Sequence, residues 1–459
     1  MELSPLYWPI SKLIDAYQKR SISPVEVLNE AMARIDRYDG KVNAYLERFE
    51  QPALKQAQKA EDDYRSGHAS VLSGIPVSIK DTFEIKGAVT TYGSRVYKTH
   101  IPDFDCGTVR RLRAAGAVFT GKTNNAEFGQ SACSQNRLGR DTGNPWDLSR
   151  TPGGSSGGAA ASVAAGLANV ALGADGGGSV RIPAAFNGLV GIKPGYGLCR
   201  NENGLRAMSD FISPGPLSWC VEDGRVLLGV LAEKQYSYTR IRESLKIAWC
   251  PTMENRPVEP GVSSAIELAR QALRSLGHQT TETEAPVAGW NDAFAPLVLA
   301  EEHRERGHLL EKARDELSDY VRISLEAGCH VSNESVKNAR QIQLRYRQTI
   351  NDFLENYDVI ATPATAVPAF PLGIRPSEIN GHKVSRLWGA FPFTAPFNVS
   401  GHPAIVIPCG LSDGLPVGLQ LVGKWEDEER LLNLAQDLEM EISFDRGFII
   451  NAWSGPSRD

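Results

Sequence analysis

Two serines and one lysine carry the chemistry that this sequence offers. Ser155 lies within the glycine run at 153–158, Ser179 directly follows the glycine run at 176–178, and Lys80 ends an apolar, strand-like stretch. Because glycine has no Cβ, such runs let backbone N–H groups approach a ligand closely. A hydroxyl flanked by exposed N–H donors, with an amine in reach, has the parts needed for acyl transfer.

Ser179 is the predicted nucleophile. The glycines before it free the amides of Gly176, Gly177, Gly178 and Ser179 to point at one spot, where they would bind a developing oxyanion. A helix expected over 180–186 adds partial positive charge at its N-terminus. An ordinary tight turn has the same composition, so the glycine run needs a base beside it before it indicates catalysis.

Lys80 is the candidate base. No histidine lies in either glycine cluster, and G-x-S-x-G is absent around both serines, so a Ser-His-Asp arrangement has no local support. A lysine base must be neutral, which requires burial that lowers its pKa from ~10.4 toward 7–8. Ser155 can accept and donate at once, so it can relay a proton from Ser179 to Lys80. The ordinary alternative for a lysine at a strand end is a solvated salt bridge.

Composition excludes several other classes of protein. The 459 residues carry a net charge of −5 with scattered lysines and arginines, which gives no footprint for nucleic acid. Seven cysteines without C-x-x-C spacing argue against disulfide frameworks and zinc ribbons and favour a reducing compartment. The chain shows neither a secretory signal nor a membrane-length apolar run, so we expect a soluble, cytoplasmic protein with no membrane partner.

Alternation of strands, glycine turns and helices over 74–195 predicts an α/β fold. A capping box at 23–26 opens an N-terminal helix that stops near Gly40. Without a linker or repeat, we expect one domain over 1–459. Its predicted parts are N-terminal helices (1–70), a catalytic core (71–200), a helix-rich substrate-cleft region (250–395) and a return to the core sheet (396–445).

The run from Gly116 to Thr123 matches the phosphate-binding pattern G-x-x-x-x-G-K-[ST]. That motif requires a strand before its first glycine and a helix after its Lys-Thr pair. Here the preceding residues favour a helix, and the β-branched residues fall inside the motif. We therefore expect a strand at this position and no nucleotide site.

The glycine clusters, taken with Lys80, resemble the amidase signature family. The similarity covers Pro152–Gly158 and Asp175–Ala184, and it extends through 121–124, 144–146, 191–194, 398–404 and 414–423. It therefore spans nearly the whole chain.

The resemblance implies a Ser-cisSer-Lys triad of Ser179, Ser155 and Lys80, with a cis peptide between Gly154 and Ser155. It implies an oxyanion hole over Gly176, Gly177, Gly178 and Ser179, and supporting roles for Ser156 and Arg181. The implied fold is an α/β/α sandwich with a mixed, twisted sheet of about eleven strands, often in a homodimer. No metal or organic cofactor is expected.

The predicted function is hydrolysis of the C–N bond of a small-molecule carboxylic amide through a serine acyl-enzyme. An alternative is the glutamine-hydrolysing subunit of a tRNA-dependent amidotransferase. Such subunits typically carry glutamine where this chain has Ile182, and this difference counts against the amidotransferase alternative. Gly197 stands where threonine is usual, which affects a loop near the site. A non-catalytic binding protein is the remote third possibility.

The acyl pocket is predicted from two short segments. Phe128, Ser131 and Cys133 represent the first, and Trp388, Phe391 and Phe393 represent the second. The aromatic side chains of the second segment suggest an apolar or aromatic acyl group, although such clusters often form core. Glu301, Glu302 and Arg304 could instead recognise a polar group.

Overall fold

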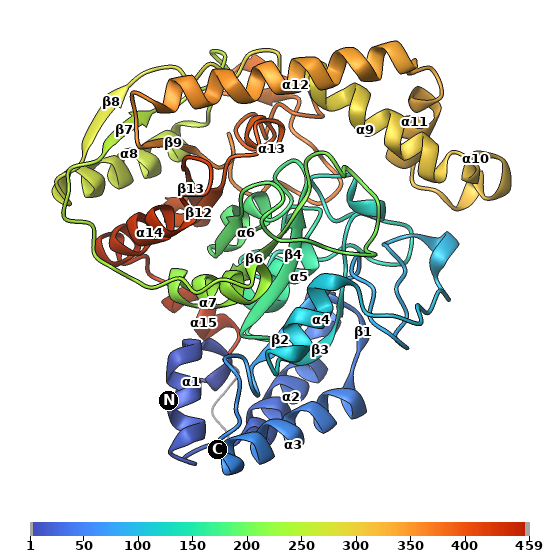
Figure 1. Ribbon diagram of the computed structural model, residues 1–459, viewed down its shortest axis with the longest axis vertical. Helices are drawn as coiled ribbons and strands as arrows, with labels where there is room; N and C mark the ends of the chain where they lie inside the picture. The colour runs from blue at the N-terminus through green and yellow to red at the C-terminus, as the bar shows by residue number, and fades with distance from the viewer. Residues whose placement is uncertain (1–2, 455–459) are drawn as a thin grey trace.

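A mixed sheet of eleven strands forms the centre of the computed structural model, which describes residues 3–454 (Figure 1). Four strand pairs are parallel, namely β2 with β3, β2 with β4, β7 with β8 and β7 with β9, and the other pairs are antiparallel. The prediction of a mixed sheet of about eleven strands is confirmed. Across the sheet the strands are β1 (Tyr45–Arg48), β3 (Val118–Thr123), β2 (Pro76–Lys80), β4 (Val170–Asp175), β6 (Ser213–Ser218), β5 (Val190–Lys193), β12 (Ala404–Ser412), β13 (Leu415–Val422), β9 (Val359–Pro363), β7 (Lys246–Trp249) and β8 (Gln279–Glu282).

Helices cover both faces of the sheet. On β5, Gly191 faces Ala184 of one helix, whereas the next residue, Ile192, contacts Gly224 of another. Successive strand residues point to opposite faces, so these helices belong to different layers. One layer contains α5 (Gly157–Ala164) and α6 (Arg181–Asn187), and the other contains α7 (Val221–Ala232), α8 (Pro260–Ser275) and α14 (Glu428–Ile442).

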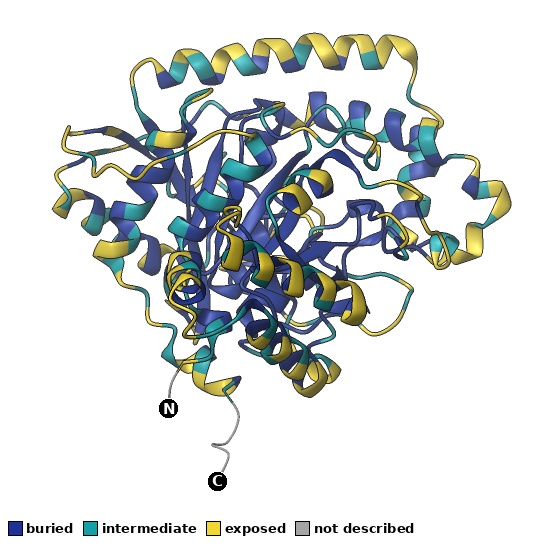
Figure 2. Ribbon diagram, turned by 60° about the horizontal axis from the view of Figure 1, so that its bottom comes forward, coloured by how far each residue is buried: buried dark blue, intermediate teal, exposed yellow. Residues whose placement is uncertain are grey.

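Further helices lie at the two ends of the sandwich. Figure 1 places α1, α2 and α3 below the sheet and the long α12 above it. Figure 2 shows the sheet dark with burial and the outer side of α12 exposed. The remaining elements are α1 (Ile10–Gln18), α2 (Pro24–Val42), α3 (Glu50–Ser66), α4 (Gly107–Ala114), α9 (Trp290–Arg306), α10 (Leu309–Lys312), α11 (Asp319–Gly328), α12 (Asn333–Leu354), α13 (Pro396–Val399), α15 (Gly447–Ala452) and the hairpin of β10 (Glu378–Ile379) and β11 (His382–Lys383).

The capping box that opens α2 forms as predicted. The Glu26 N–H donates to Ser23 Oγ at 3.1 Å, and the Ser23 N–H donates to Glu26 Oε2 at 2.8 Å. The helix ends at Val42, slightly beyond the expected Gly40, because Asn43 adopts the left-handed conformation that terminates it (φ 57°).

Two segments expected to be helical also supply strands. The N-terminal 1–70 segment contributes β1 at one edge of the sheet, and the 250–395 segment contributes β8 at the other. Both are four-residue edge strands with mostly exposed or half-exposed residues. Their short polar sequences give little period-2 signal, so pairing with a neighbouring strand decides their conformation.

The phosphate-loop-like run is a strand, as expected. Val118–Thr123 is fully buried as β3 and pairs with β2 in parallel. The Lys122 ammonium lies 2.7 Å from Asp81 Oδ1 and donates to Thr90 Oγ1 at 2.8 Å. Its side chain therefore stabilises the core rather than contacting phosphate.

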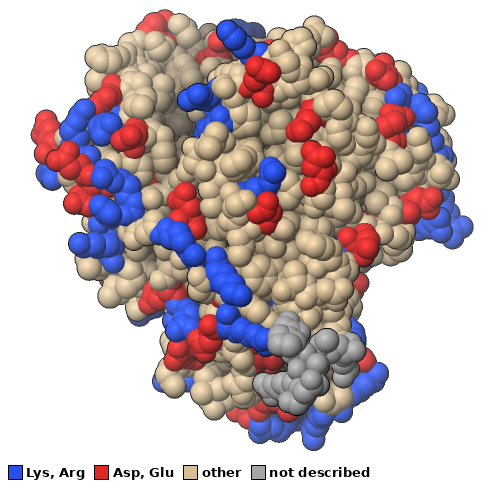
Figure 3. All heavy atoms as spheres, turned by 180° about the vertical axis from the view of Figure 1, so that it is seen from behind, with Lys and Arg blue, Asp and Glu red and all other residues tan. Residues whose placement is uncertain are grey.

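Charge is dispersed over the surface. Figure 3 shows lysines and arginines interspersed with acidic side chains over the rear face. Among the helices of residues 3–454, none combines the length and apolar character needed to cross a bilayer.

Replacing Gly158 by alanine should lower the free energy of unfolding. A Cβ there would lie 2.5 Å from the Asn124 carbonyl oxygen and 2.6 Å from that of Ala44, and both belong to fixed backbone. Overpacking of this kind costs about 1–3 kcal/mol. Gly40 is the matched control, because it is also helical but has open space around its Cβ position. Gly40→Ala should stabilise by about 0.5–1 kcal/mol. Urea unfolding of both variants tests the pair, and equal shifts would contradict the packing argument.

Candidate active site

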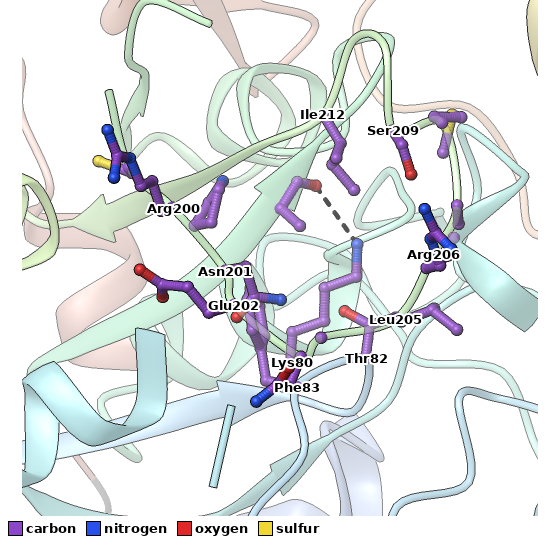
Figure 4. A pocket seen from close by; sticks show the side chains of 18 of the residues that line it. Lys80, Thr82, Phe83, Arg200, Asn201, Glu202, Leu205, Arg206, Ser209 and Ile212 are labelled. Carbon is purple, nitrogen blue, oxygen red and sulfur yellow. Dashed lines mark hydrogen bonds between the residues drawn. The ribbon is translucent and has the colours of Figure 1, made fainter. Parts of the chain in front are cut away.

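Lys80 ends β2 with its amine in the protein interior. The residue is 1% exposed, and Nζ donates to Ser155 Oγ at 2.6 Å and to the Ala174 carbonyl at 3.4 Å (Figure 4). Burial lowers the pKa of Lys80 to about 7, although the charge of Asp175 opposes the shift. A neutral amine is therefore well populated near neutral pH.

The carboxylate next to Lys80 in sequence is already paired. Asp81 forms the buried ion pair with Lys122, and its N–H donates to the Thr123 carbonyl, which fixes the end of β2 against β3. Within residues 3–454, no carboxylate lies within 4.0 Å of the Lys80 ammonium. Lys80 therefore has the hydroxyl of Ser155, rather than an acid, as its side-chain partner.

Ser155 is held by a tightly packed loop. The Gly154–Ser155 peptide is cis, as the family resemblance implied. Ser134 fastens the loop on both sides, since its Oγ donates to the Gly153 carbonyl at 2.9 Å and accepts from the Gly157 N–H at 2.8 Å. A Cβ on Gly154 would lie 2.5–2.7 Å from backbone atoms of Cys133, so only glycine fits there.

Ser179 lies beside this loop, just before α6. The Ser156 N–H donates to the Ser179 carbonyl at 3.2 Å, which joins the two serine-bearing loops. Ser156 Oγ also contacts the Ala174 backbone, donating to its carbonyl at 3.3 Å. Within residues 3–454 the Ser179 hydroxyl has no hydrogen-bond partner. Catalytic hydrogen bonds often tighten only when substrate is bound.

The glycine loop before Ser179 differs from expectation at one N–H. Gly178 donates its N–H to Asp175 Oδ1 at 2.7 Å, so this group is already engaged. Within the described chain, the N–H groups of Gly176, Gly177 and Ser179 have no acceptor. Gly178 instead supplies backbone freedom, because its φ is +126° and a Cβ there would overlap Thr394 Oγ1.

Asp175 and Arg181 form the buried centre of this loop. Both are fully buried, and Arg181 donates to the carboxylate through Nε at 2.9 Å and Nη2 at 2.8 Å. Burial alone would raise the pKa of Asp175, but the guanidinium and the Asn398 amide outweigh it and hold that pKa well below its usual range. Arg181 also donates to the Thr394 carbonyl at 3.0 Å, which ties the glycine loop to a distant part of the chain.

A cavity of about 610 Å³ opens onto Lys80 and Ser155. Its wall is largely the irregular segment 196–214, together with Thr82, Phe83 and Phe128. Ser179 does not line it. The Met208 side chain lies between the cavity and the glycine loop, since its sulfur would be 2.8 Å from a Cβ on Gly176.

The predicted pocket residues have different environments. Phe128 lines the cavity, with Arg306 stacked on its ring. Ser131 accepts a hydrogen bond from Arg375 Nη2 at 2.6 Å, and Cys133 packs beneath Gly154, where burial raises the pKa of its thiol.

The second predicted segment lies outside the lining of this cavity, but the Trp388 ring lies 3.5 Å from the Cβ position of Gly177 in the glycine loop. Trp388 stacks edge-on against Trp290 and Phe294, and Phe391 packs on Phe186 and Phe370 in the core. Phe393 is fully buried.

The acidic pair on α9 makes protein contacts rather than facing open space. Glu301 accepts from the Ser209 N–H at 2.7 Å, and Glu302 accepts from Arg306 and Gln130. Arg304 is exposed beside Glu301. Sequence reasoning therefore missed most of the cavity wall at 196–214, which has no periodic pattern or motif to reveal it.

Comparison with known proteins identifies the family to which this chain is similar. The amidase family model matches residues 26–432. The A subunit of glutamyl-tRNA(Gln) amidotransferase from Caldanaerobacter subterraneus subsp. tengcongensis is 33% identical over 97% of this chain and 98% of its own. A solved amidase superposes with a TM-score of 0.89 at 29% identity, covering 95% of this chain and 100% of its own. The corresponding amidotransferase protein from Thermotoga maritima superposes with a TM-score of 0.77 at 29% identity over 96% of each chain.

Asp175→Asn should strongly destabilise the protein, because it leaves the Arg181 guanidinium buried without its counter-charge. Removing one partner of a buried pair costs about 3–5 kcal/mol. The exposed pair of Asp62 and Arg65 is the control, with side chains 70% and 60% exposed. Asp62→Asn should cost less than about 1 kcal/mol. Similar urea midpoints for the two variants would show that the buried pair is not critical for stability.

Proposed function

This chain belongs to the amidase family and cleaves amide C–N bonds, and we propose that it does so through a covalent acyl intermediate on Ser179. One observation carries the proposal: a buried lysine amine, without a carboxylate partner, lies 2.6 Å from the Ser155 hydroxyl oxygen. An amine in this state can accept a proton near pH 7, which a solvated lysine cannot do efficiently.

The reaction begins with proton transfer along the two serines. The Ser155 hydroxyl gives its proton to the neutral Lys80 amine and takes the proton of Ser179 Oγ. The Ser179 oxygen attacks the carbonyl carbon, and the electron pair of the C=O bond moves to its oxygen. The N–H groups of Gly176, Gly177 and Ser179, which have no acceptor within the described chain, would bind that oxyanion.

Collapse of the tetrahedral intermediate reverses the proton path. The C–N bond breaks as Lys80 returns the proton through Ser155 to the leaving nitrogen, which departs as ammonia or an amine. Water then attacks the acyl-enzyme by the same route and releases the acid. The Asp175–Arg181 pair is a positioning unit here, since it fixes the glycine loop without reaching the substrate.

A second function is favoured by the curated relatives. The 33% identity to the A subunit of an amidotransferase extends over both chains almost completely, which supports glutamine hydrolysis with transfer of ammonia to a partner. Two features support a stand-alone amidase instead: Ile182 in the nucleophile loop, and a backbone that superposes on the solved amidase with the higher TM-score. Under the stand-alone proposal the enzyme is cytoplasmic and forms a homodimer.

Two measurements separate these functions. A stand-alone amidase elutes from a sizing column as one or two copies of itself and hydrolyses carboxamides other than glutamine without a partner subunit. An amidotransferase component releases ammonia chiefly from glutamine and co-purifies with partner subunits from its native host. Glutamine as the sole good substrate would overturn the stand-alone proposal.

Ser179→Ala should lower kcat by at least about 10⁴-fold, because no other group can form the acyl intermediate. Lys80→Ala should come close to that loss. A sulfonyl fluoride should add one covalent mass to the wild-type protein and none to Ser179→Ala. Ser66→Ala, at the exposed end of α3, is the control and should behave as wild type. More than a tenth of the wild-type kcat in either triad variant would refute the assignment.

The pH profile should report the lowered pKa of Lys80. Protonated Lys80 cannot accept the proton, so kcat/KM should fall below pH 7 and rise to a plateau above it, with an inflection at about 7. Lys193 is the control, because burial also lowers its pKa to about 7. Lys193→Met should keep the inflection. Its disappearance in that variant would assign the titration to Lys193 instead.

A further inference from the structure

We propose that the cavity above Lys80 contains a carboxylate subsite formed by Arg206 and Thr82, so that the preferred substrates are amides with an anionic group beyond the scissile bond. This rests on the proposed function, since the cavity opens onto Lys80 and Ser155, which form the proton path from Ser179 in that proposal. The subsite specifies which amides the proposed reaction prefers, namely those that carry an anionic group.

The charge of the cavity wall is the first observation. Arg206 lines the cavity, and within residues 3–454 it forms neither an ion pair nor a side-chain hydrogen bond. Glu202 is the sole acidic residue among the described ones that line the cavity. Its Oε1 is paired with Arg111 at 2.5 Å, and its Oε2 lies 3.9 Å from Arg110 without a hydrogen-bond partner. The cavity is therefore cationic without a protein counter-ion for Arg206.

The other two acids in contact with this segment, Asp210 within it and Glu301 on α9, are also engaged. Asp210 pairs with Arg340 at 2.8 Å, and Glu301 accepts the Ser209 N–H at 2.7 Å. The Ser209 carbonyl accepts from the Tyr196 hydroxyl at 2.9 Å. These contacts hold the backbone of the segment that bears Arg206, whose exposed side chain lines the cavity.

Thr82 provides the second, independent observation. It lines the cavity, is 6% exposed, and its Oγ1 is buried without any hydrogen-bond partner. A buried hydroxyl without a partner is unfavourable and is expected to find one when a ligand binds. Figure 4 shows Thr82 and Arg206 on the same side of the Lys80 side chain, with Arg200 and Glu202 on the other.

These two groups fit a carboxylate. A guanidinium offers parallel N–H donors that match the two carboxylate oxygens, and a hydroxyl can donate to one of them. The cavity volume of about 610 Å³ is in the range that small-molecule sites occupy. A linear amide with a carboxylate at its far end can therefore occupy the cavity with its amide at Ser155.

The test compares three amides of similar length that differ in terminal charge: glutaramate (anionic), glutaramide (neutral) and 5-aminopentanamide (cationic). With rates counted per amide group, wild-type kcat/KM should be at least about ten-fold higher for glutaramate than for glutaramide, as expected for a charge-assisted hydrogen bond. It should be lowest for 5-aminopentanamide.

Variants assign the preference to its residues. Arg206→Gln should reduce the glutaramate-to-glutaramide ratio to within about two-fold of unity, and Thr82→Val should reduce it by about three-fold, the loss of one neutral donor. Arg200→Gln is the matched control, because this second cavity arginine lies on the opposite side of Lys80 and should leave the ratio unchanged.

Binding to the Ser179→Ala variant makes the test independent of turnover. Calorimetry should give a Kd for glutaramate about ten-fold lower than for glutaramide, and Arg206→Gln in that background should remove the difference. An unaltered ratio in Arg206→Gln, or equal affinities in the parent, would overturn the subsite. Amide hydrolysis without any charge preference would leave the proposed function intact, whereas full activity of Ser179→Ala would remove the function itself.

Discussion

Everything in the site depends on keeping one lysine amine buried and without an acid. Removal of Lys80 from water makes its neutral form accessible, and the 2.6 Å contact with Ser155 gives that neutral form a proton to accept. A carboxylate in contact would restore the charge and abolish the base. The fold meets this condition because Asp81 is paired with Lys122 and Asp175 is paired with Arg181, so neither acid is in contact with Lys80.

The buried ion pairs have a structural role that is separate from the reaction. Asp175 gathers backbone N–H groups from its own loop, and through Arg181 it reaches Gln420 on β13 and Asn398 on α13. The loop that carries Ser179 is thereby tied to strands from the far end of the chain. Buried ion pairs seldom add net stability over apolar packing, but losing one partner is costly, so they fix geometry strongly.

Sequence reasoning reached the parts of this molecule that obey local rules. The capping box at Ser23 and the buried strand at 118–123 follow from spacing and composition, and both formed as predicted. The sequence predicts that the Gly178 N–H binds the oxyanion. In the structure this N–H donates to Asp175 Oδ1 instead, and only the folded loop reveals that hydrogen bond. Phe391 is predicted as a pocket residue and packs on Phe186 and Phe370, because an aromatic side chain serves core and pocket equally well. Long-range packing decides such cases, and no single stretch of sequence encodes it.

The same distinction explains how one chemistry can serve different substrates. Lys80 and Ser179 are placed at the ends of β2 and α6, where sheet pairing and buried charges permit little change. Arg206 and Met208 belong instead to an irregular segment outside the regular elements, held by a few contacts such as that of Glu301 with Ser209. Substitutions in this segment change the cavity wall without removing a residue of the proton path. Relatives that share nearly the whole sheet can therefore differ in substrate, and evidence on substrate must come from this segment rather than from the residues that perform the reaction.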